Sequence, residues 1–197
     1  MIHDTIPHMS NPPLADCMRL PSAADHVARS DGNRAWSRLR DAGVCPTCRE
    51  IETGVATADE DGRLIFEDER SFAMLERFPR GLGHTIVIAK PHVADIADLP
   101  EPLGCHLMTV MVRLARALTE VTGCEKVYQV TMCSGPLSHL HFQLIPRLPG
   151  EQIGGGVFST ERMVLESPGP LASAIKAALR SPHGADRESR VPSVEGP

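Results

Sequence analysis

The chain has 197 residues, 42% of them apolar, and its 25 acidic and 20 basic side chains give a net charge of −5 at pH 7. This length fits one domain with tails, and the composition excludes general disorder. No uncharged apolar run of about 18 residues or more occurs, so we expect no membrane span. The first residues lack a secretory signal pattern, and the acidic excess argues against nucleic-acid binding, so we expect a cytoplasmic protein.

The N-terminal part of the chain shows little hydrophobic periodicity. Residues 1–30 contain four prolines, and we expect them to wrap over a surface or to stay mobile. A short helix is predicted at residues 34–41, ended by Gly43. Strand patterns follow at residues 63–67, 71–77 and 84–90.

The strongest helical pattern lies in the middle of the chain. Residues 103–119 place apolar side chains three and four positions apart, just after Pro102. Two more strands are predicted at residues 126–132 and 138–145, and a last helix at residues 171–180. Strand pairs around a central helix predict an α+β fold with an antiparallel sheet and a C-terminal helix.

These patterns divide the chain into three predicted parts. A Pro-rich N-terminal segment covers residues 1–30, a compact domain covers residues 31–166, and the C-terminal helix with a flexible tail covers residues 167–197. The glycines at 154–156 are interpreted as a joint near the end of the compact domain.

Six cysteines occur, at positions 17, 45, 48, 105, 124 and 133. An even number permits a disulfide framework, but chains that depend on one are usually short and secreted. Reduced thiols, some of them metal ligands, are the favoured interpretation. We expect Cys105, Cys124 and Cys133 to be small buried hydrophobic residues.

The most informative segment runs from residue 139 to residue 147. Side chains alternate between the faces of a strand, so His139, His141 and Gln143 share one face and the apolar residues between them face the core. The polar face is consistent with simple exposure to water. Two histidines at this spacing also suit metal binding, or one imidazole presented to a substrate while the other is anchored.

A Cys-x-x-Cys turn at Cys45 and Cys48 brings two thiolates to one point. Zinc binding, a redox pair and a chance pattern are all open from these residues alone. A redox pair is typical of a helix start in a thioredoxin-like βαβ unit, which is not predicted here. Tetrahedral zinc needs two further ligands, and the candidates are His92 and one histidine of the pair at 139 and 141.

Together these motifs resemble the histidine-triad (HIT) superfamily of nucleotidyl hydrolases and transferases. The resemblance covers roughly residues 45–149 and includes the Cys-x-x-Cys pair and the segments 66–70, 83–92 and 134–147. The family motif is His-φ-His-φ-His-φ-φ, where φ is apolar, and Gln143 stands in place of the third histidine. A glutamine there is similar to the galactose-1-phosphate uridylyltransferase and dinucleoside-polyphosphate phosphorylase branch.

The resemblance implies a zinc ion and a nucleophile on the same strand. The implied zinc ligands are Cys45, Cys48, His92 and His139. Four protein ligands leave no open position, so the zinc would be structural. His141 would be the nucleophile, with a backbone carbonyl on its other ring nitrogen, and Gln143 would act beside it in catalysis.

Phosphate contacts are implied ahead of the motif, where many relatives carry Gly-Gln-Ser/Thr-Val. This chain has Ser134, Gly135, Pro136 and Leu137 instead. Backbone N–H groups around Gly135 and the hydroxyl of Ser134 or Ser138 would substitute for the lost glutamine contact.

Further contacts are implied by residues outside the motif. Glu76 falls where relatives often place an acidic ribose ligand, and Arg77 where several have an apolar residue beside the base. Arg80, Lys90 and Arg147 are either solvated charges or side chains that neutralise phosphate, with Arg147 counted among the phosphate-binding candidates.

The implied activity is nucleotidyl transfer or phosphorolysis of a nucleoside di- or polyphosphate, or a nucleotide sugar, through a nucleotidyl-histidine. Phosphate or a sugar phosphate would be the acceptor, and a homodimer would share one extended sheet. Hydrolysis that releases a mononucleotide and a non-catalytic nucleotide-binding regulator are the alternatives. Uridylyltransferases of this branch are typically about twice as long, with two such halves, so this chain would correspond to one half.

Overall fold

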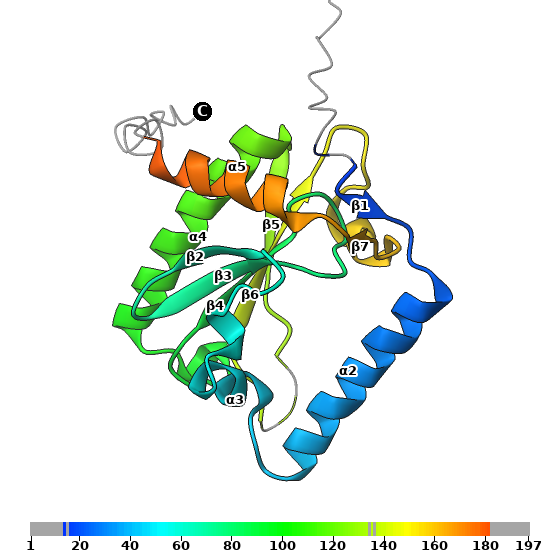
Figure 1. Ribbon diagram of the computed structural model, residues 1–197. Coiled ribbons are helices and arrows are strands. Elements are labelled where there is room, and N and C mark those ends of the chain that lie inside the picture. Colours follow the sequence, from blue (N-terminus) through cyan, green and yellow to red (C-terminus); the bar gives the residue numbers. More distant parts are fainter. Residues whose placement is uncertain (1–13, 15, 134, 136, 182–197) are drawn as a thin grey trace, which may run out of the picture.

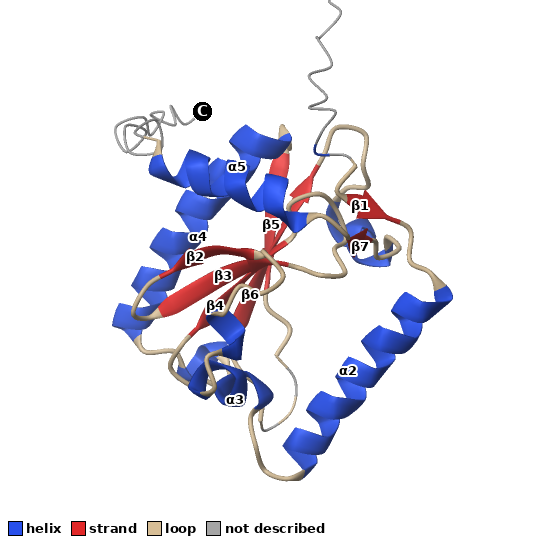
Figure 2. Cartoon of the chain, in the orientation of Figure 1, coloured by secondary structure: helices blue, strands red, loops and turns tan. Residues whose placement is uncertain are grey.

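The computed structural model describes residue 14, residues 16–133, residue 135 and residues 137–181. Its centre is a five-stranded antiparallel sheet with the strand order β2-β3-β4-β6-β5. The strands are β2 (Leu64–Glu67), β3 (Ser71–Leu75), β4 (Thr85–Ala89), β5 (Lys126–Val130) and β6 (His141–Arg147). This sheet and the helices beside it confirm the predicted α+β fold (Figures 1 and 2).

Helix α4 (Glu101–Thr122) packs against the sheet, and α5 (Pro168–Arg180) packs against α4 and β2. The apolar positions that predicted α4 are its buried face. The helix ends at Gly123, whose φ of 69° is a left-handed conformation that glycine adopts without strain.

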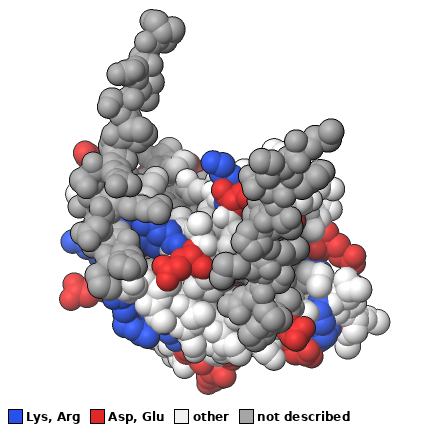
Figure 3. Space-filling model, turned by 90° about the horizontal axis from the view of Figure 1, so that it is seen from above, with Lys and Arg blue, Asp and Glu red and all other residues white. Residues whose placement is uncertain are grey.

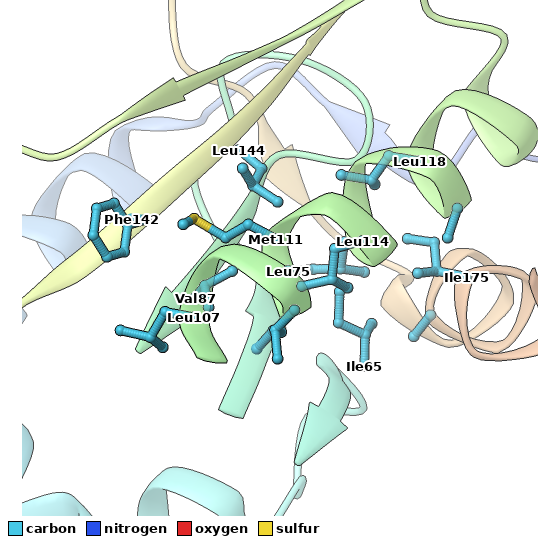
Figure 4. Close-up of a cluster of buried hydrophobic side chains, with 14 of the residues drawn as sticks. Ile65, Leu75, Val87, Leu107, Met111, Leu114, Leu118, Phe142, Leu144 and Ile175 are labelled. Atoms are coloured by element: carbon cyan, nitrogen blue, oxygen red, sulfur yellow. The ribbon is translucent and has the colours of Figure 1, made fainter. Parts of the chain in front are cut away.

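The hydrophobic core lies between this helix and one face of the sheet. Figure 4 shows Val87 and Leu144 of the sheet close to Met111 and Leu114 of α4. Val87 and Leu114 have no exposed surface. Burial of each large apolar side chain stabilises the fold by about 1.5–3 kcal/mol, so this layer fixes the position of β4 and β6.

The register of β4 and β6 determines which side chains share the other face. Ile86 lies opposite Gln143, and Ile88 lies opposite His141. Directly opposed residues of an antiparallel pair project to the same side, so these four side chains lie on one face. Val87 alternates with Ile86 and Ile88 and points to the core, which leaves His141 and Gln143 on the face away from α4.

Strand β6 begins at His141, later than the predicted start at residue 138. The preceding segment is still fixed, because the Leu140 N–H donates to the carbonyl of Val93 at 2.7 Å. The predicted alternation holds on the core side, where Leu140, Phe142 and Leu144 are buried.

The N-terminal region contains more structure than predicted. β1 (Met18–Arg19) pairs with β7 (Val164–Leu165), and α2 (Ala23–Asp41) is much longer than the predicted helix at 34–41. A capping box of Ser22 and Asp25 starts α2, a signal that the sequence analysis missed. α2 has no buried residue and stands beside the sheet in Figure 1.

Four shorter helical segments complete the described chain. α3 (Pro46–Glu52) begins at the Cys-x-x-Cys pair, followed by the 3₁₀ segments η1 (Val55–Thr57) and η2 (Ile96–Asp98). A third 3₁₀ segment, η3 (Gly154–Ser159), occupies the predicted glycine joint. The Cys-x-x-Cys pair therefore lies at a helix start and not in a turn.

The other cysteines only partly follow the prediction. Cys124 is buried as expected, Cys133 is half-buried, and Cys105 is exposed on α4, so its predicted burial is wrong. None of the helices in the described residues is long and apolar enough to cross a membrane. In the view of Figure 3, basic and acidic side chains are intermixed around an uncharged area.

Candidate functional site

Three segments bring the four predicted metal ligands together, in a group we call the metal cluster. The ligand atoms all lie within 4.8 Å of one another, and the group consists of Cys45, Cys48, His92 and His139. Cys48 Sγ lies 3.2 Å from Nδ1 of His92 and 3.4 Å from Nδ1 of His139. Cys45 Sγ lies 3.5 Å from the same nitrogen of His139. Tetrahedral zinc bonds of ordinary length place such atoms about 3.3–3.8 Å apart, so the cluster fits zinc.

The tautomer of His139 also fits a metal ligand. Its Nε2 lies 2.6 Å from the carbonyl oxygen of Ala89. A carbonyl can only accept, so Nε2 carries the proton and Nδ1 keeps a lone pair directed at the thiols. This backbone contact is the usual outer-shell partner of a metal-binding histidine. The prediction that these residues come together in a group suitable for metal binding is confirmed.

The pKa values of two candidate ligands show which protonation states they have before a metal binds. Burial and the neighbouring Cys45 thiol raise the pKa of Cys48 to about 11. Burial lowers the pKa of His139, which keeps its imidazole neutral. Bound zinc favours thiolates and neutral imidazoles, so it stabilises these ligands in the forms that bind it.

His141 lies next to the metal cluster but uses its ring differently. Its Nδ1 lies 2.9 Å from the carbonyl oxygen of His139 and must donate to it. In the neutral imidazole the proton is therefore on Nδ1, and Nε2 keeps its lone pair. His141 is only half-buried, whereas His139 is 5% exposed. A neutral imidazole with a free Nε2 can act as a nucleophile.

Gln143 lies two residues further along β6, on the same face as His141. We call these two residues, both predicted to be catalytic, the catalytic row. Oε1 of Gln143 lies 3.1 Å from Nε2 of His84, a side chain that is 1% exposed. Nδ1 of His84 accepts a hydrogen bond from the backbone N–H of Arg80 at 3.1 Å.

The environment of His84 keeps this imidazole neutral. Burial, and then the nearby charges of Arg162 and Arg80, lower its pKa to about 4. Gly83 holds His84 close to α4, because its φ is +81° and an added Cβ would lie 3.0 Å from Leu118. A larger residue at position 83 would push the start of β4 off the helix.

Other predicted site residues are placed as follows. Glu76 accepts a hydrogen bond from the backbone N–H of Phe78 at 2.9 Å. Ser138 is buried, and its N–H donates to the carbonyl of Gly135 at 3.2 Å. Gly135 has a φ of 86°. Ser134 lies outside the described residues.

The three candidate cations all have partners within the fold. Arg80 donates to backbone carbonyls of η3 and the following turn, at Phe158 and Thr160. Lys90 pairs with Glu67 at 2.7 Å, and Arg147 pairs with Glu125. Arg147 is six residues beyond His141, a separation of about 20 Å along a strand. The structure therefore does not bring the Arg147 guanidinium to the catalytic row.

His84 is the residue that the sequence analysis missed. It lies within the segment that resembles the family, but no pattern connected it to Gln143. The link depends on the register of β4 against β6, which positions residues 59 apart in the chain side by side.

Comparison with known proteins identifies the family. Residues 57–150 match the model of the HIT domain. An adenosine 5'-monophosphoramidase of Schizosaccharomyces pombe is 31% identical over 98 residues, which are 47% of this chain and 69% of that protein. The chain belongs to the histidine-triad family. The predicted superfamily is thus confirmed.

Solved structures agree with this membership. A Zn-bound histidine-triad family protein from Mycobacterium smegmatis is 26% identical, with a TM-score of 0.57 over 72% of this chain and 97% of that one. A uridylyltransferase structure has a TM-score of 0.52 at 22% identity, over 77% of this chain and 50% of that one. The second likeness shows a shared fold alone, and neither one distinguishes nucleotidyl transfer from hydrolysis.

Proposed function

We propose that this histidine-triad protein is a nucleotidyltransferase or phosphorylase that acts through a nucleotidyl-histidine on His141. The observation that carries the proposal is the ring of His141, whose Nδ1 is fixed on the His139 carbonyl while Nε2 keeps a lone pair. The substrate class is a nucleoside di- or polyphosphate, including nucleotide sugars.

Two displacements at phosphorus complete the proposed reaction. In the first, the Nε2 lone pair forms a bond to the α-phosphorus, and the bond to the bridging oxygen breaks. The leaving phosphate group takes that electron pair. In the second, an oxygen of phosphate or of a sugar phosphate attacks the same phosphorus, and Nε2 leaves with its electron pair as a neutral imidazole.

Gln143 favours phosphate groups both as the leaving group and as the acceptor. A glutamine amide can donate hydrogen bonds but cannot deliver or remove a proton near neutral pH. Phosphate leaving groups need little protonation, whereas amine leaving groups need an acid. Water also needs a base to become a good nucleophile, so a phosphate-bearing acceptor has the advantage.

The remaining site residues are proposed as binding groups. Glu76 would accept hydrogen bonds from the ribose hydroxyls, using the carboxylate that Phe78 N–H holds in place. Backbone N–H groups near Gly135, with Ser134 and Ser138, would contact phosphate. Zinc in the metal cluster would be structural and would hold the segment that leads into β6.

We also propose that the protein is a homodimer. β5 is an edge strand of the sheet, and strands of two copies could pair there. Met108 and Val112 of α4 and Met132 after β5 are 50%, 41% and 51% exposed. Light scattering should give twice the chain mass, and Val112→Glu should shift the protein toward the monomer.

The main alternative is hydrolysis, because a relative named as a monophosphoramidase covers much of this domain. The test incubates the protein with a panel of nucleotides at rising phosphate or sugar phosphate concentration and measures transfer product against free mononucleotide. Transfer predicts a ratio that rises with acceptor. A ratio near zero at millimolar acceptor, with rapid mononucleotide release, supports the hydrolase, and binding without turnover supports a non-catalytic regulator.

A further inference from the structure

The neighbouring hydrogen bonds determine which member of the buried pair of His84 and Gln143 donates and which accepts. Nδ1 of His84 accepts from the Arg80 backbone N–H, which is a donor under all conditions. Nδ1 therefore carries no proton, and in a neutral imidazole the proton must be on Nε2. Nε2 in turn needs an acceptor, and the group 3.1 Å away is the side-chain amide of Gln143.

From this geometry we infer that His84 is a positioning residue that holds the Gln143 carbonyl oxygen and so turns the Gln143 NH₂ toward the substrate phosphate. The assignment of oxygen and nitrogen in the amide follows from a backbone N–H and does not rest on the placement of the amide itself. The inference deepens the proposed function, because it rests on phosphate binding beside His141.

The contacts of Gln143 agree with this orientation. Gln143 is 8% exposed to solvent. Among the described residues, no other group accepts a hydrogen bond from its NH₂. Phosphoryl oxygens only accept hydrogen bonds, so an NH₂ turned toward the phosphate matches them, whereas an amide oxygen in that place would repel them.

The chemistry of the row follows from this direction. Hydrogen bonds run from the Arg80 N–H to His84, from His84 to Gln143, and from Gln143 to the phosphate. Both side chains donate without changing protonation, because burial and two arginine charges keep His84 neutral. Through Gln143, His84 thereby stabilises negative charge on the phosphoryl oxygens. Neither side chain protonates the leaving group.

The first test reads the tautomer directly and needs no catalysis. Nitrogen NMR of labelled wild-type protein should show an unprotonated Nδ1 and a protonated Nε2 for His84 at pH 7. The Gln143 NH₂ resonances should shift when AMP or UMP is added. A proton on Nδ1 of His84, or an unmoved Gln143 NH₂ at saturating nucleotide, overturns the inference.

The second test uses substitutions at position 84. His84→Phe removes the donor and keeps the ring volume, and loss of one neutral hydrogen bond should slow nucleotidylation of His141 about tenfold. His84→Gln restores a donor and should keep the rate within about threefold. Both variants should retain KM within about threefold, since the lost contact acts on the charged transition state.

Ser71→Ala is the matched control, because Ser71 is equally buried and bonds to Asp68 and His106 away from the site. It should lose stability without losing rate. Equal losses in His84→Phe and Ser71→Ala, or no loss in His84→Phe, overturn the inference. If no nucleotide labels His141 in wild-type protein, the proposed function fails while the NMR result still decides the orientation of Gln143.

Discussion

The metal cluster and the catalytic row are formed by the same segment of chain, and they differ in how their ring nitrogens are used. His139 has both nitrogens engaged, with Nδ1 beside two thiols and Nε2 on the Ala89 carbonyl. His141, two residues later, has one nitrogen on a carbonyl, and no residue in the described part of the chain bonds to the other. Two histidines of one motif can thus serve stability and chemistry separately, because backbone carbonyls decide which nitrogen carries the proton.

The largest expected effect is loss of the metal. Purified protein should contain about one zinc per chain, and structural zinc sites contribute on the order of 10 kcal/mol to folding in small domains. Removal of zinc, or His139→Ala, should therefore lower the melting temperature steeply and expose α3. Elemental analysis and thermal unfolding measure both quantities. Metal-free protein with unchanged melting would contradict the structural role.

His141→Ala is the variant matched to His139→Ala. It should keep zinc content and melting temperature near wild type, because His141 is half-buried and lies outside the metal cluster. Turnover should fall at least about a thousandfold, since the nucleophile is lost. If His141→Ala loses zinc like His139→Ala, the two histidines do not have separate roles.

The pH dependence of stability reports His84, the buried hydrogen-bond partner of Gln143. The pKa of His84 is lowered by burial to about 4, against about 6.5 for an unfolded histidine. As pH falls below about 6.5 the unfolded chain takes up the proton first, so stability present at neutral pH is lost between about pH 6.5 and 4. We expect a loss on the order of 2–3 kcal/mol at pH 4.5.

Urea unfolding of wild type and His84→Gln at pH 7.5 and pH 4.5 measures this contribution. Zinc release at low pH affects both proteins, so the difference between them isolates His84. The wild type should lose more stability than the variant, by an amount on the order of 2–3 kcal/mol. Parallel losses would show that His84 is not kept neutral in the fold.

The smallest expected effect concerns Gln143. Gln143→His introduces a group that can protonate a leaving group and activate water, so the ratio of transfer to hydrolysis should fall severalfold. Gln143→Ala should slow both steps and leave the ratio nearly unchanged. Product ratios at fixed phosphate concentration measure this, and an unchanged ratio in Gln143→His would show that proton transfer at this position does not set the outcome.

Much of this arrangement was predictable because it depends on local patterns. The 3.6-residue periodicity predicted α4, and motif resemblance predicted the four metal ligands. The start of α2 was predictable in principle from the Ser22 and Asp25 capping box, but the Pro-rich surroundings obscured it. The exposure of Cys105 depends on which face of α4 meets the sheet.

The contact between His84 and Gln143, and the contact between His139 and the Ala89 carbonyl, were not predictable in the same way. They arise from the register between strands far apart in the sequence. A shift of this register by one residue would turn every side chain of the strand to the opposite face of the sheet. Arg147 shows the same limit, because only the fold reveals that Glu125 neutralises it. The types of the candidate site residues can be read from the sequence, whereas the ring nitrogen that carries the proton in each histidine depends on tertiary contacts.

The measurement that tests the central claim most directly is the capture of the covalent intermediate. Wild-type protein is mixed with nucleotides labelled at the α-phosphorus, quenched in base, digested and analysed by mass spectrometry. We expect an acid-labile nucleotide on His141 that is absent from His141→Ala and that is transferred to product when phosphate or a sugar phosphate is added. A label on another residue, or full turnover by His141→Ala, would contradict it.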